Sequence, residues 1–236
     1  MGGRQLPTLY GVSLGPGNPK LLTLRAVEVL REAPKVFVPS SKGISRAEAI
    51  VSYFTKKRRI IRLDFPMVKD EAIVAKALQR NASRVCSILQ RYGSCAYAAL
   101  GDLSLYSTFW RLYPYVKEKI HDLDIEVIPG VPSFCACAAS AKIPLALGDD
   151  IITIIPLSAS RERIENLARY ADTSILLKIK PSVIRSLKLV GKEYQQAVLA
   201  IHCSTDDEQV RVANIKELEE LSKYFALIIV KRRKFL

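Results

Sequence analysis

The sequence has little histidine and no pair of cysteines at the spacing of a metal or redox motif. It contains 2 His and 5 Cys in 236 residues, and no Cys-x-x-Cys occurs. Cys135 and Cys137 are closest together, in the Ala-rich run 134–139, which is typical of small apolar packing. We therefore expect no metal site and no redox centre. A chain of this length also buries enough surface to need no disulfide.

Long apolar runs are absent as well. The longest, Ile151–Leu157 and Phe225–Val230, are far shorter than the roughly 20 residues of a membrane-spanning helix. Residues 1–7 lack the apolar stretch of a secretory signal peptide. These absences favour a cytoplasmic protein that has no membrane partner.

Acidic residues are outnumbered by basic ones. The chain has 36 Lys+Arg against 23 Asp+Glu, a formal net charge of +13. So basic a surface attracts anionic partners, which include nucleic acid, anionic lipid and small polyanions. The runs Lys56–Arg59 and Lys231–Lys234 are typical of nucleic-acid patches, and also of a solvated turn and a frayed terminus. Charge alone leaves these alternatives open.

Short apolar runs alternate with helical patterns along the chain. Residues 70–91 form the clearest helical pattern, with one apolar stripe and Asp70 at the start. This alternation predicts an α/β fold with a mainly parallel sheet in the first half. The polar segment 121–124, after a helix interrupted by Pro114, predicts domains of residues 1–120 and 121–236. Strands are expected at residues 9–14, 35–39, 60–63, 94–100, 125–128, 151–155, 174–179, 197–202 and 225–231.

A Gly/Pro turn joins the first strand to the first helix. It reads Gly11-Val-Ser-Leu-Gly15-Pro16-Gly17. It lacks the Gly-Lys-Ser/Thr of a Walker A loop and the glycine order of a dinucleotide-binding fingerprint. Pro16 restricts the backbone between two flexible glycines, so the turn has a defined shape. The pattern indicates either a ligand loop without a phosphate-binding lysine or a plain strand-to-helix turn.

Two further glycine turns follow apolar strands, where open α/β sheets bind ligands. Gly101-Asp102 comes after the strand predicted at 94–100, and Gly130 follows the next strand. Gly101 would let a ligand approach the backbone. Asp102 would accept hydrogen bonds, face a cation, or cap a helix that begins near Ser104.

Together these motifs resemble the tetrapyrrole methylase family of S-adenosylmethionine (SAM) methyltransferases. The resemblance covers nearly the whole chain and rests on Gly15-Pro16-Gly17, Gly101-Asp102, Pro129-Gly130-Val131-Pro132-Ser133 and Ile143-Pro144-Leu145. The segments 101–109 and 39–50 are most similar to members that methylate C-20 of precorrin-2 or its cobalt form. Leu103 and Asn18 stand where family members commonly have Pro and Asp.

The resemblance implies two α/β domains with a SAM-binding cleft between them, and a homodimer. It also implies SAM as the methyl donor and no metal. The implied SAM contacts are Pro16, Gly101, Asp102, Leu105, Ser133, Phe134, Ile179, Ala200 and Ala226.

The implied substrate is a small anionic tetrapyrrole with acetate and propionate groups, and no nucleic acid. A basic protein attracts and pairs with such carboxylates. Lys42, Arg46 and Arg111 are candidate partners, and Tyr106 is a candidate for positioning the macrocycle, with a buried core tyrosine as the alternative. The implied reaction is methyl transfer to the C-20 meso carbon in cobalamin biosynthesis, which requires alignment and exclusion of water.

Other functions remain as alternatives. Within the family they are a methylase for another ring carbon, diphthine synthase and ribosomal-RNA 2′-O-methyltransferase, and Tyr106-Ser107-Thr108 argues against them. From another class, the chain could be a non-enzymatic nucleic-acid-binding protein that uses the two basic runs. It has no aromatic–basic interleaving, zinc finger or helix-turn-helix signal to support that function.

Overall fold

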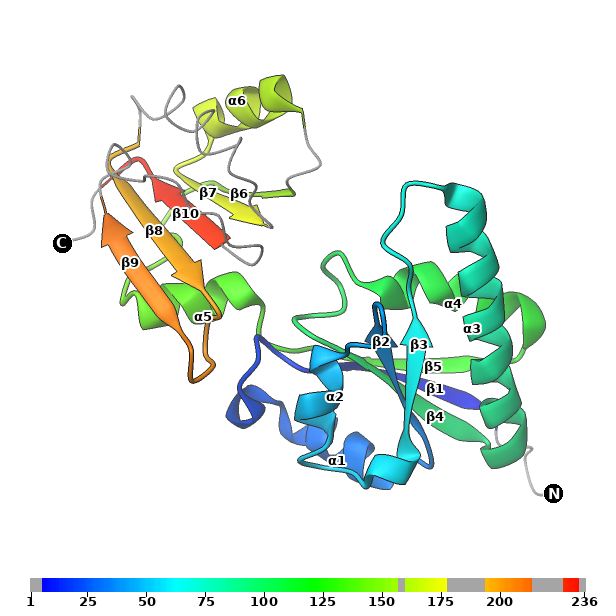
Figure 1. Cartoon of the computed structure of the whole chain (residues 1–236). Helices are drawn as coiled ribbons and strands as arrows, with labels where there is room; N and C mark the ends of the chain where they lie inside the picture. The colour runs from blue at the N-terminus through cyan, green and yellow to red at the C-terminus, as the bar shows by residue number, and fades with distance from the viewer. Residues whose placement is uncertain (1–5, 157–159, 178–193, 214–226, 234–236) are drawn as a thin grey trace. The chain divides into compact units, whose positions relative to one another are not determined.

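The computed structural model describes residues 6–156, 160–177, 194–213 and 227–233. The chain divides into two compact units, Met1–Pro132 (unit 1) and Ser133–Leu236 (unit 2). Each unit is built around a five-stranded sheet, and Figure 1 shows the two sheets in colours that run from blue to green and from yellow to red. The prediction of two α/β domains is confirmed in its fold class.

The sheet of unit 1 is entirely parallel, in the order β3-β2-β4-β1-β5. The parallel arrangement predicted for the first half is therefore confirmed. Its strands are β1 (Thr8–Ser13), β2 (Val36–Ser40), β3 (Ile60–Asp64), β4 (Ser94–Ala99) and β5 (Asp124–Ile128). The connecting helices and short 3-10 turns are η1 (Pro19–Leu21), α1 (Leu24–Glu32), α2 (Arg46–Val51), η2 (Lys57–Arg59), α3 (Glu71–Tyr92) and α4 (Thr108–Lys119).

Helices cover both faces of this sheet (Figure 1). On one face, α1 and α2 bury Leu30 and Ile50 against the sheet. On the other, α3 and α4 bury Leu89 and Phe109. Strands β1 and β4 are neighbours, but the helices that follow them lie on opposite faces. Open α/β sheets bind ligands at the carboxyl ends of such a pair of strands.

The longest helix begins and ends at residues that the sequence marks. The Asp70 carboxylate accepts hydrogen bonds from the backbone N–H groups of Ala72 and Ile73 at the start of α3. The helix ends at Gly93, which has a φ of 76°. The helix predicted at 70–91 is therefore confirmed to within one residue at each end.

Helix α4 runs through Pro114 without a break, so the interruption expected there does not occur. Phe109, Leu112 and Val116 are all buried in the core of unit 1. Because these side chains anchor both halves of the helix on the sheet, tertiary packing overrides the unfavourable helix propensity of proline.

The sheet of unit 2 is mixed, in the order β6-β7-β10-β8-β9. The pair β6–β7 is parallel, and the other three pairs are antiparallel. Strand β9 was not expected, because its sequence contains no apolar run. In the structure its residues are exposed or half-buried. The elements are α5 (Ser133–Ser140), β6 (Ile152–Pro156), α6 (Arg161–Tyr170), β7 (Thr173–Leu177), β8 (Gln196–Ile201), β9 (Gln209–Ala213) and β10 (Leu227–Lys231).

The two units divide later in the chain than the expected boundary at residues 120/121. Strand β5 lies beyond that point, yet it pairs in register with β1 from Thr8↔Asp124 to Val12↔Ile128. It therefore belongs to unit 1, which extends to Pro132. The polar segment 121–124 is the turn that leads from α4 into this edge strand.

Two expectations about unit 2 are wrong. Cys137 does not merely pack among small residues, because it forms a disulfide with Cys203. The C-terminal basic run is not wholly a frayed end, because Lys231 is the last residue of β10 and is 5% exposed. Its ammonium donates a hydrogen bond to the carbonyl of Pro144 at 2.7 Å. Burial lowers the pKa of Lys231, although the carboxylates of Asp150 and Asp172 oppose this effect.

Candidate functional site

The candidate site is a group of three loops at the carboxyl edge of the unit 1 sheet. They follow neighbouring strands: residues 14–17 after β1, 100–106 after β4 and 129–132 after β5. Because every strand of this sheet is parallel, the three loops emerge at the same edge. We call residues 14–17, 100–106 and 129–132 the loop cluster.

Two glycines join the first two loops. The Gly15 N–H donates to the Gly101 carbonyl at 3.2 Å, and the Gly101 N–H donates to the Gly15 carbonyl at 2.7 Å. Their φ angles are 68° and 77°, which L side chains rarely adopt. A Cβ added to Gly101 would meet no heavy atom within 4 Å. The space beside this Cα is therefore open to a ligand.

Asp102 joins the second loop to the third. Its Oδ1 accepts hydrogen bonds from the backbone N–H and the hydroxyl of Ser104, and its Oδ2 accepts one from the Gly130 N–H at 2.8 Å. No helix begins at Ser104, because α4 begins at Thr108 with Ser107 as its cap. The helix-cap alternative for Asp102 is therefore wrong.

The environment of Asp102 favours its ionised form. Burial raises the pKa of this carboxyl, but the hydrogen bonds from Ser104 and Gly130 outweigh burial and lower the pKa below its ordinary value. The carboxylate is therefore charged at neutral pH. Both of its oxygens are bonded within the protein, so it organises the loops, and a direct contact with SAM stays a prediction.

Leu103 is one of the two departures from the family pattern, in which a proline is common at this position. Burial of its side chain and a backbone hydrogen bond hold it in place. Its side chain is fully buried, and its N–H donates to the Ser13 hydroxyl at 3.0 Å. Proline has no N–H and could not make this bond. A Cβ added to Gly11 would lie 3.0 Å from Cδ1 of Leu103, so this side chain packs directly on β1. At the other departure, the Asn18 side chain caps η1.

The remaining predicted residues of unit 1 also lie on these loops. Pro16 and Leu105 are half-buried. The N–H of Leu105 donates to the Asp102 carbonyl at 3.1 Å. Tyr106 is 55% exposed and has a φ of 53°, which is uncommon for a residue other than glycine. The alternative that Tyr106 is a buried core residue is therefore wrong.

The three cations predicted to face the substrate lie at the same edge of the sheet. Lys42 is in the turn after β2, Arg46 is the first residue of α2, and Arg111 is in the first turn of α4. All three are exposed. The run Lys56–Arg59, in contrast, precedes β3 and therefore lies at the opposite, amino edge.

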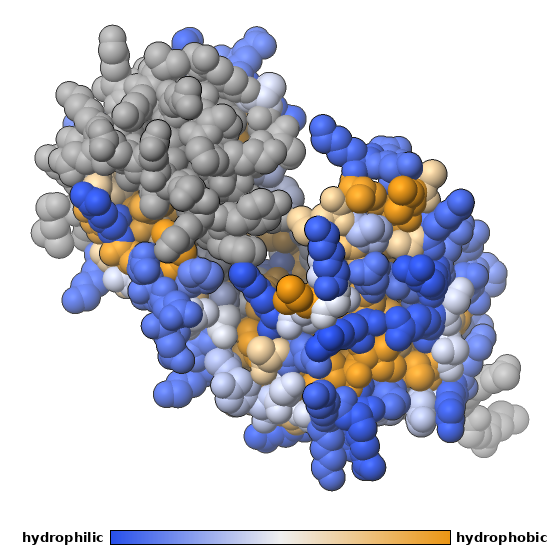
Figure 2. All heavy atoms as spheres, in the orientation of Figure 1, coloured by the Kyte–Doolittle hydropathy of each residue, from blue (hydrophilic) through white to orange (hydrophobic). Residues whose placement is uncertain are grey.

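Hydrophobic side chains are also exposed at the carboxyl edge. Met67 and Val68, between β3 and α3, are 75% and 50% exposed, and Trp110 in α4 is 43% exposed. Figure 2 shows a hydrophobic patch, in orange, over the start of α3 and bordered by hydrophilic residues. An edge that offers apolar contacts and cations suits a ligand with an apolar body and anionic groups.

The residues predicted for unit 2 are placed as follows. Ser133 and Phe134 begin α5, and Phe134 is 8% exposed. Ala200 is in β8 and is 1% exposed. Ile179 and Ala226 lie outside the described residues. The cofactor cleft expected between the two domains stays a prediction.

The loop cluster fits SAM better than a cofactor that carries phosphate groups. Its three segments contain no Lys or Arg that could face a phosphate. The open space at Gly101 admits a ligand close to the backbone, and SAM has a ribose and an amino-acid tail but no phosphate. The residues present are therefore compatible with SAM.

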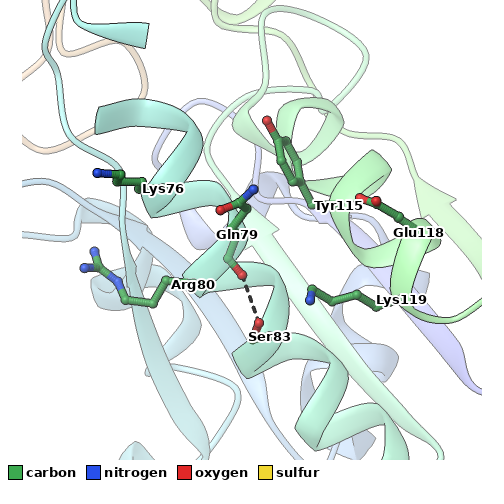
Figure 3. Close-up of a pocket in the computed structure, with 7 residues that line it drawn as sticks. All are labelled: Lys76, Gln79, Arg80, Ser83, Tyr115, Glu118 and Lys119. Atoms are coloured by element: carbon green, nitrogen blue, oxygen red, sulfur yellow. Dashed lines mark hydrogen bonds between the residues drawn. The ribbon is translucent and has the colours of Figure 1, made fainter. Parts of the chain in front are cut away.

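A pocket of about 590 Å³ elsewhere on unit 1 is less suited to this cofactor. It lies between α3 and α4, and Figure 3 shows charged side chains from both helices around it. Tyr115 and Lys119 come from the second half of α4, away from the carboxyl edge. The lining residues are Lys76, Gln79, Arg80, Ser83, Tyr115, Glu118 and Lys119. Such a lining is typical of a solvated basic surface.

Two kinds of site are not found in the part of the chain that the structure describes. There, no three His, Cys, Asp or Glu side chains gather into a group that could hold a metal ion. Within the same residues, no helix is both long and apolar enough to span a membrane.

Comparison with known proteins decides the family. Residues 8–219 match the family model of Tetrapyrrole (Corrin/Porphyrin) Methylases. The chain belongs to this family. Membership confirms the resemblance seen in the motifs and the prediction of a SAM-dependent methyltransferase. Leu103 and Asn18 are therefore departures within a member of this family.

Individual relatives extend over nearly the whole chain. The "Probable cobalt-precorrin-2 C(20)-methyltransferase" of Methanocaldococcus jannaschii is 32% identical over 96% of both chains. The precorrin-2 C(20)-methyltransferase of Sinorhizobium sp is 25% identical and covers 98% of this chain and 97% of its own. The crystal structure of a cobalamin synthesis related protein from Corynebacterium diphtheriae shares the fold, with a TM-score of 0.79, 18% identity and coverage of 96% of this chain and 99% of its own.

Sequence reasoning missed two contributors to the loop cluster. One is Ser13, whose hydroxyl is buried at the end of β1. The other is the bond between Asp102 and the Gly130 N–H, although both residues had been singled out. A buried serine at the end of an apolar strand was the available signal for Ser13, since buried hydroxyls are usually hydrogen-bonded. Nothing in the sequence indicated which group it binds.

Proposed function

We propose that this methylase transfers the methyl group of SAM to the C-20 meso carbon of precorrin-2, or of its cobalt form, in cobalamin biosynthesis. Similarity along nearly the whole chain to relatives named for that reaction carries the proposal. One of these names specifies the cobalt form and the other does not. Both forms are therefore candidate substrates.

The proposed cofactor contacts are the residues taken from the family motifs. SAM, when bound, supplies a methyl group on a positively charged sulfur that is already activated for transfer. The bonds among Gly15, Gly101, Asp102 and Gly130 would hold the loop cluster in one shape before the cofactor arrives. Such pre-organisation reduces the entropy cost of binding. The full proposed set is Pro16, Gly101, Asp102, Leu105, Ser133, Phe134, Ile179, Ala200 and Ala226.

The substrate would lie against the carboxyl edge of unit 1. Exposed Tyr106 and Trp110 offer aromatic faces to a conjugated ring. Lys42, Arg46 and Arg111 would pair with carboxylates at its rim. The protein's task is to align the acceptor carbon with the methyl group and to exclude water. Nothing in this chemistry requires a metal or a covalent intermediate.

We further propose that the enzyme works in the cytoplasm as a homodimer, with a small anionic tetrapyrrole and no nucleic acid as its partner. The basic runs would then serve solubility and steering of the substrate rather than RNA binding. Mass measurement in solution tests the dimer. A gel shift with single-stranded and duplex RNA at increasing salt tests the nucleic-acid alternative, which predicts salt-sensitive binding.

A methyl-transfer assay tests the proposed reaction. The purified enzyme is given SAM with precorrin-2, cobalt-precorrin-2 or a porphyrin that has few carboxylates, and the methylated carbon of any product is located by NMR. We expect a product methylated at C-20 from one or both precorrins. A methyl group at another ring carbon would make the chain a methylase of different specificity. Whichever carbon is methylated, calorimetry without added metal should show that the enzyme binds S-adenosylhomocysteine.

A further inference from the structure

The disulfide of unit 2 joins a helix to a turn that are far apart in the sequence. Cys137 is in α5, and Cys203 follows the end of β8, with a sequence separation of 66. Both are buried, at 0% and 8% exposure. Figure 1 shows α5 beside the end of β8 and the start of β9. The bond therefore fixes α5 to one end of this pair of strands.

A second contact holds the same two segments together. The hydroxyl of Ser140, the last residue of α5, donates to Oε2 of Glu208 at 2.9 Å. The backbone N–H of Ser204 donates to the same carboxylate oxygen. Glu208 immediately precedes β9, so it joins α5 to both sides of the β8–β9 turn.

The turn has a backbone that needs such support. His202 and Ser204, on either side of Cys203, have φ angles of 53° and 58°. Residues other than glycine keep this conformation only where the surroundings fix it. The hydrogen bond from the Thr205 N–H to the His202 carbonyl, the disulfide and Glu208 provide those constraints.

Helix α5 also depends on outside contacts. It has 8 residues, and isolated helices shorter than about 12 residues are marginal in water. Ser133 and Phe134 lie four and three positions before Cys137, so they share its face of the helix. A bond at Cys137 therefore sets the rotation of α5 and, with it, the direction in which Ser133 and Phe134 point.

We propose that Cys137 and Cys203 are positioning residues for the cofactor: their bond fixes Ser133 and Phe134 of α5 relative to Ala200 of β8. This inference rests on the proposed function, in which these three residues contact SAM. Ala200 is paired within the sheet with Val210 and Leu227, so its place is already set. The disulfide gives the short helix the same fixed reference.

The first test is whether the bond forms in the purified protein. Denatured without reductant, the chain should show three reactive thiols, from Cys86, Cys95 and Cys135, and five after reduction, which is its full cysteine count. Five thiols without reductant would overturn the inference.

The second test measures affinity for S-adenosylhomocysteine by calorimetry, at a temperature where circular dichroism shows every variant folded. We expect the Cys137→Ala/Cys203→Ala double variant to bind it about tenfold more weakly, because α5 must then be ordered on binding. Cys135→Ser is the matched control, since this exposed free cysteine lies on the same helix. It should bind as the wild type does.

The outcomes separate this inference from the proposed function. If the wild type binds no S-adenosylhomocysteine, the methyltransferase proposal fails. If the wild type binds and the folded double variant binds equally well, or Cys135→Ser is weakened as much, the positioning role is wrong. If the double variant does not fold, Ser140→Ala decides, because it removes only the second contact. It should then weaken binding two- to threefold, as about one lost hydrogen bond allows, and unchanged binding would overturn the inference.

Discussion

The two units fix the segments that we propose to bind SAM in different ways. In unit 1, three loops are held by hydrogen bonds, from Gly15 to Gly101, from Leu103 to Ser13 and from Gly130 to Asp102. In unit 2, a covalent bond from Cys137 to Cys203 holds α5 against the β8–β9 turn, with Glu208 beside it. In the first arrangement backbone N–H groups donate to backbone and side-chain oxygens of a neighbouring loop or strand. The second joins two side chains covalently.

Sheet topology accounts for this difference. In a parallel sheet all carboxyl ends lie at one edge, so the loops that follow β1, β4 and β5 are close enough to bond directly. In unit 2, β8, β9 and β10 are antiparallel to their neighbours, and successive turns lie at opposite edges. Helix α5 is held at one of these edges by the disulfide and by the hydrogen bond between Ser140 and Glu208.

Gly130→Ala should have the largest effect and tests how tightly the loop cluster is packed. A Cβ there would lie 2.6 Å from Cβ of Ser13 and 3.3 Å from the Gly101 carbonyl oxygen. Relief of this clash requires the loops to move, so we expect a loss of about 3 kcal/mol in the free energy of unfolding. Urea denaturation measures it.

Gly43→Ala is the matched control for this clash. Gly43 has a φ of 77° and no heavy atom within 4 Å of the added Cβ, so it reports backbone strain alone. We expect it to cost about 1 kcal/mol. Equal losses in the two variants would show that the loop cluster is not held more tightly than an isolated turn, and the contrast between the units would disappear.

Asp102→Ala should have the next largest effect. It leaves the Gly130 N–H without its acceptor, and we expect a loss of about 2 kcal/mol in stability together with weaker binding of S-adenosylhomocysteine. Because the pKa of Asp102 is lowered in the folded protein, its ionised form stabilises the fold above the ordinary carboxyl pKa of 3.8. This contribution is lost as the pH falls through the lowered folded-state pKa.

Asp102→Asn separates charge from hydrogen bonding at this position. The amide keeps an oxygen that can accept from Gly130, but it does not titrate between pH 2 and 5. Chemical denaturation across that range should therefore show a shallower loss of stability in acid than the wild type has. Identical profiles would mean that Asp102 is not the titrating group that links these loops.

Sequence patterns mark the residues of the loop cluster in unit 1, but they do not mark the residues that hold α5 in unit 2. In unit 1, apolar runs bounded by Gly and Pro mark the strand ends, and parallel topology then brings Gly101, Asp102 and Gly130 to one edge. In unit 2, α5 is held by Cys137, Cys203 and Glu208, and no local sequence pattern connects these three residues. The disulfide was missed because its two cysteines are separated by 66 positions and neither belongs to a motif.

Hydrogen-bond partners were also beyond the sequence in unit 1. Asp102 reads equally well as a helix cap, because carboxylates accept backbone N–H groups in both roles. Only the path of the chain after β4 shows that α4 starts later, at Thr108. Leu103 stands where family members commonly have a proline, and the bond from its N–H to Ser13 restrains the loop in place of a proline ring.

Ser13→Ala should have a smaller effect, and it tests whether the bond from Leu103 to Ser13 restrains the loop after β4. It leaves the buried N–H of Leu103 without an acceptor, at a cost of about 1 kcal/mol in the free energy of unfolding. We expect a several-fold weaker affinity for S-adenosylhomocysteine, because the loop after β4 loses a restraint. Ser13→Thr, which keeps the hydroxyl, should recover part of this affinity. Full affinity in Ser13→Ala would show that packing of Leu103 alone fixes the loop.

Arg111→Gln should have the smallest effect, and it tests whether the charge at the carboxyl edge serves the substrate. An exposed ion pair contributes about 0.5 kcal/mol, so KM for the tetrapyrrole should rise about twofold at low salt. Lys57→Gln, in the basic run at the amino edge, should leave KM unchanged. The difference between the two variants should shrink at 1 M salt, where the Debye length is about 3 Å. If Lys57→Gln raised KM and Arg111→Gln did not, the substrate would approach the opposite edge of the sheet. The loop cluster would then not be the site of methyl transfer.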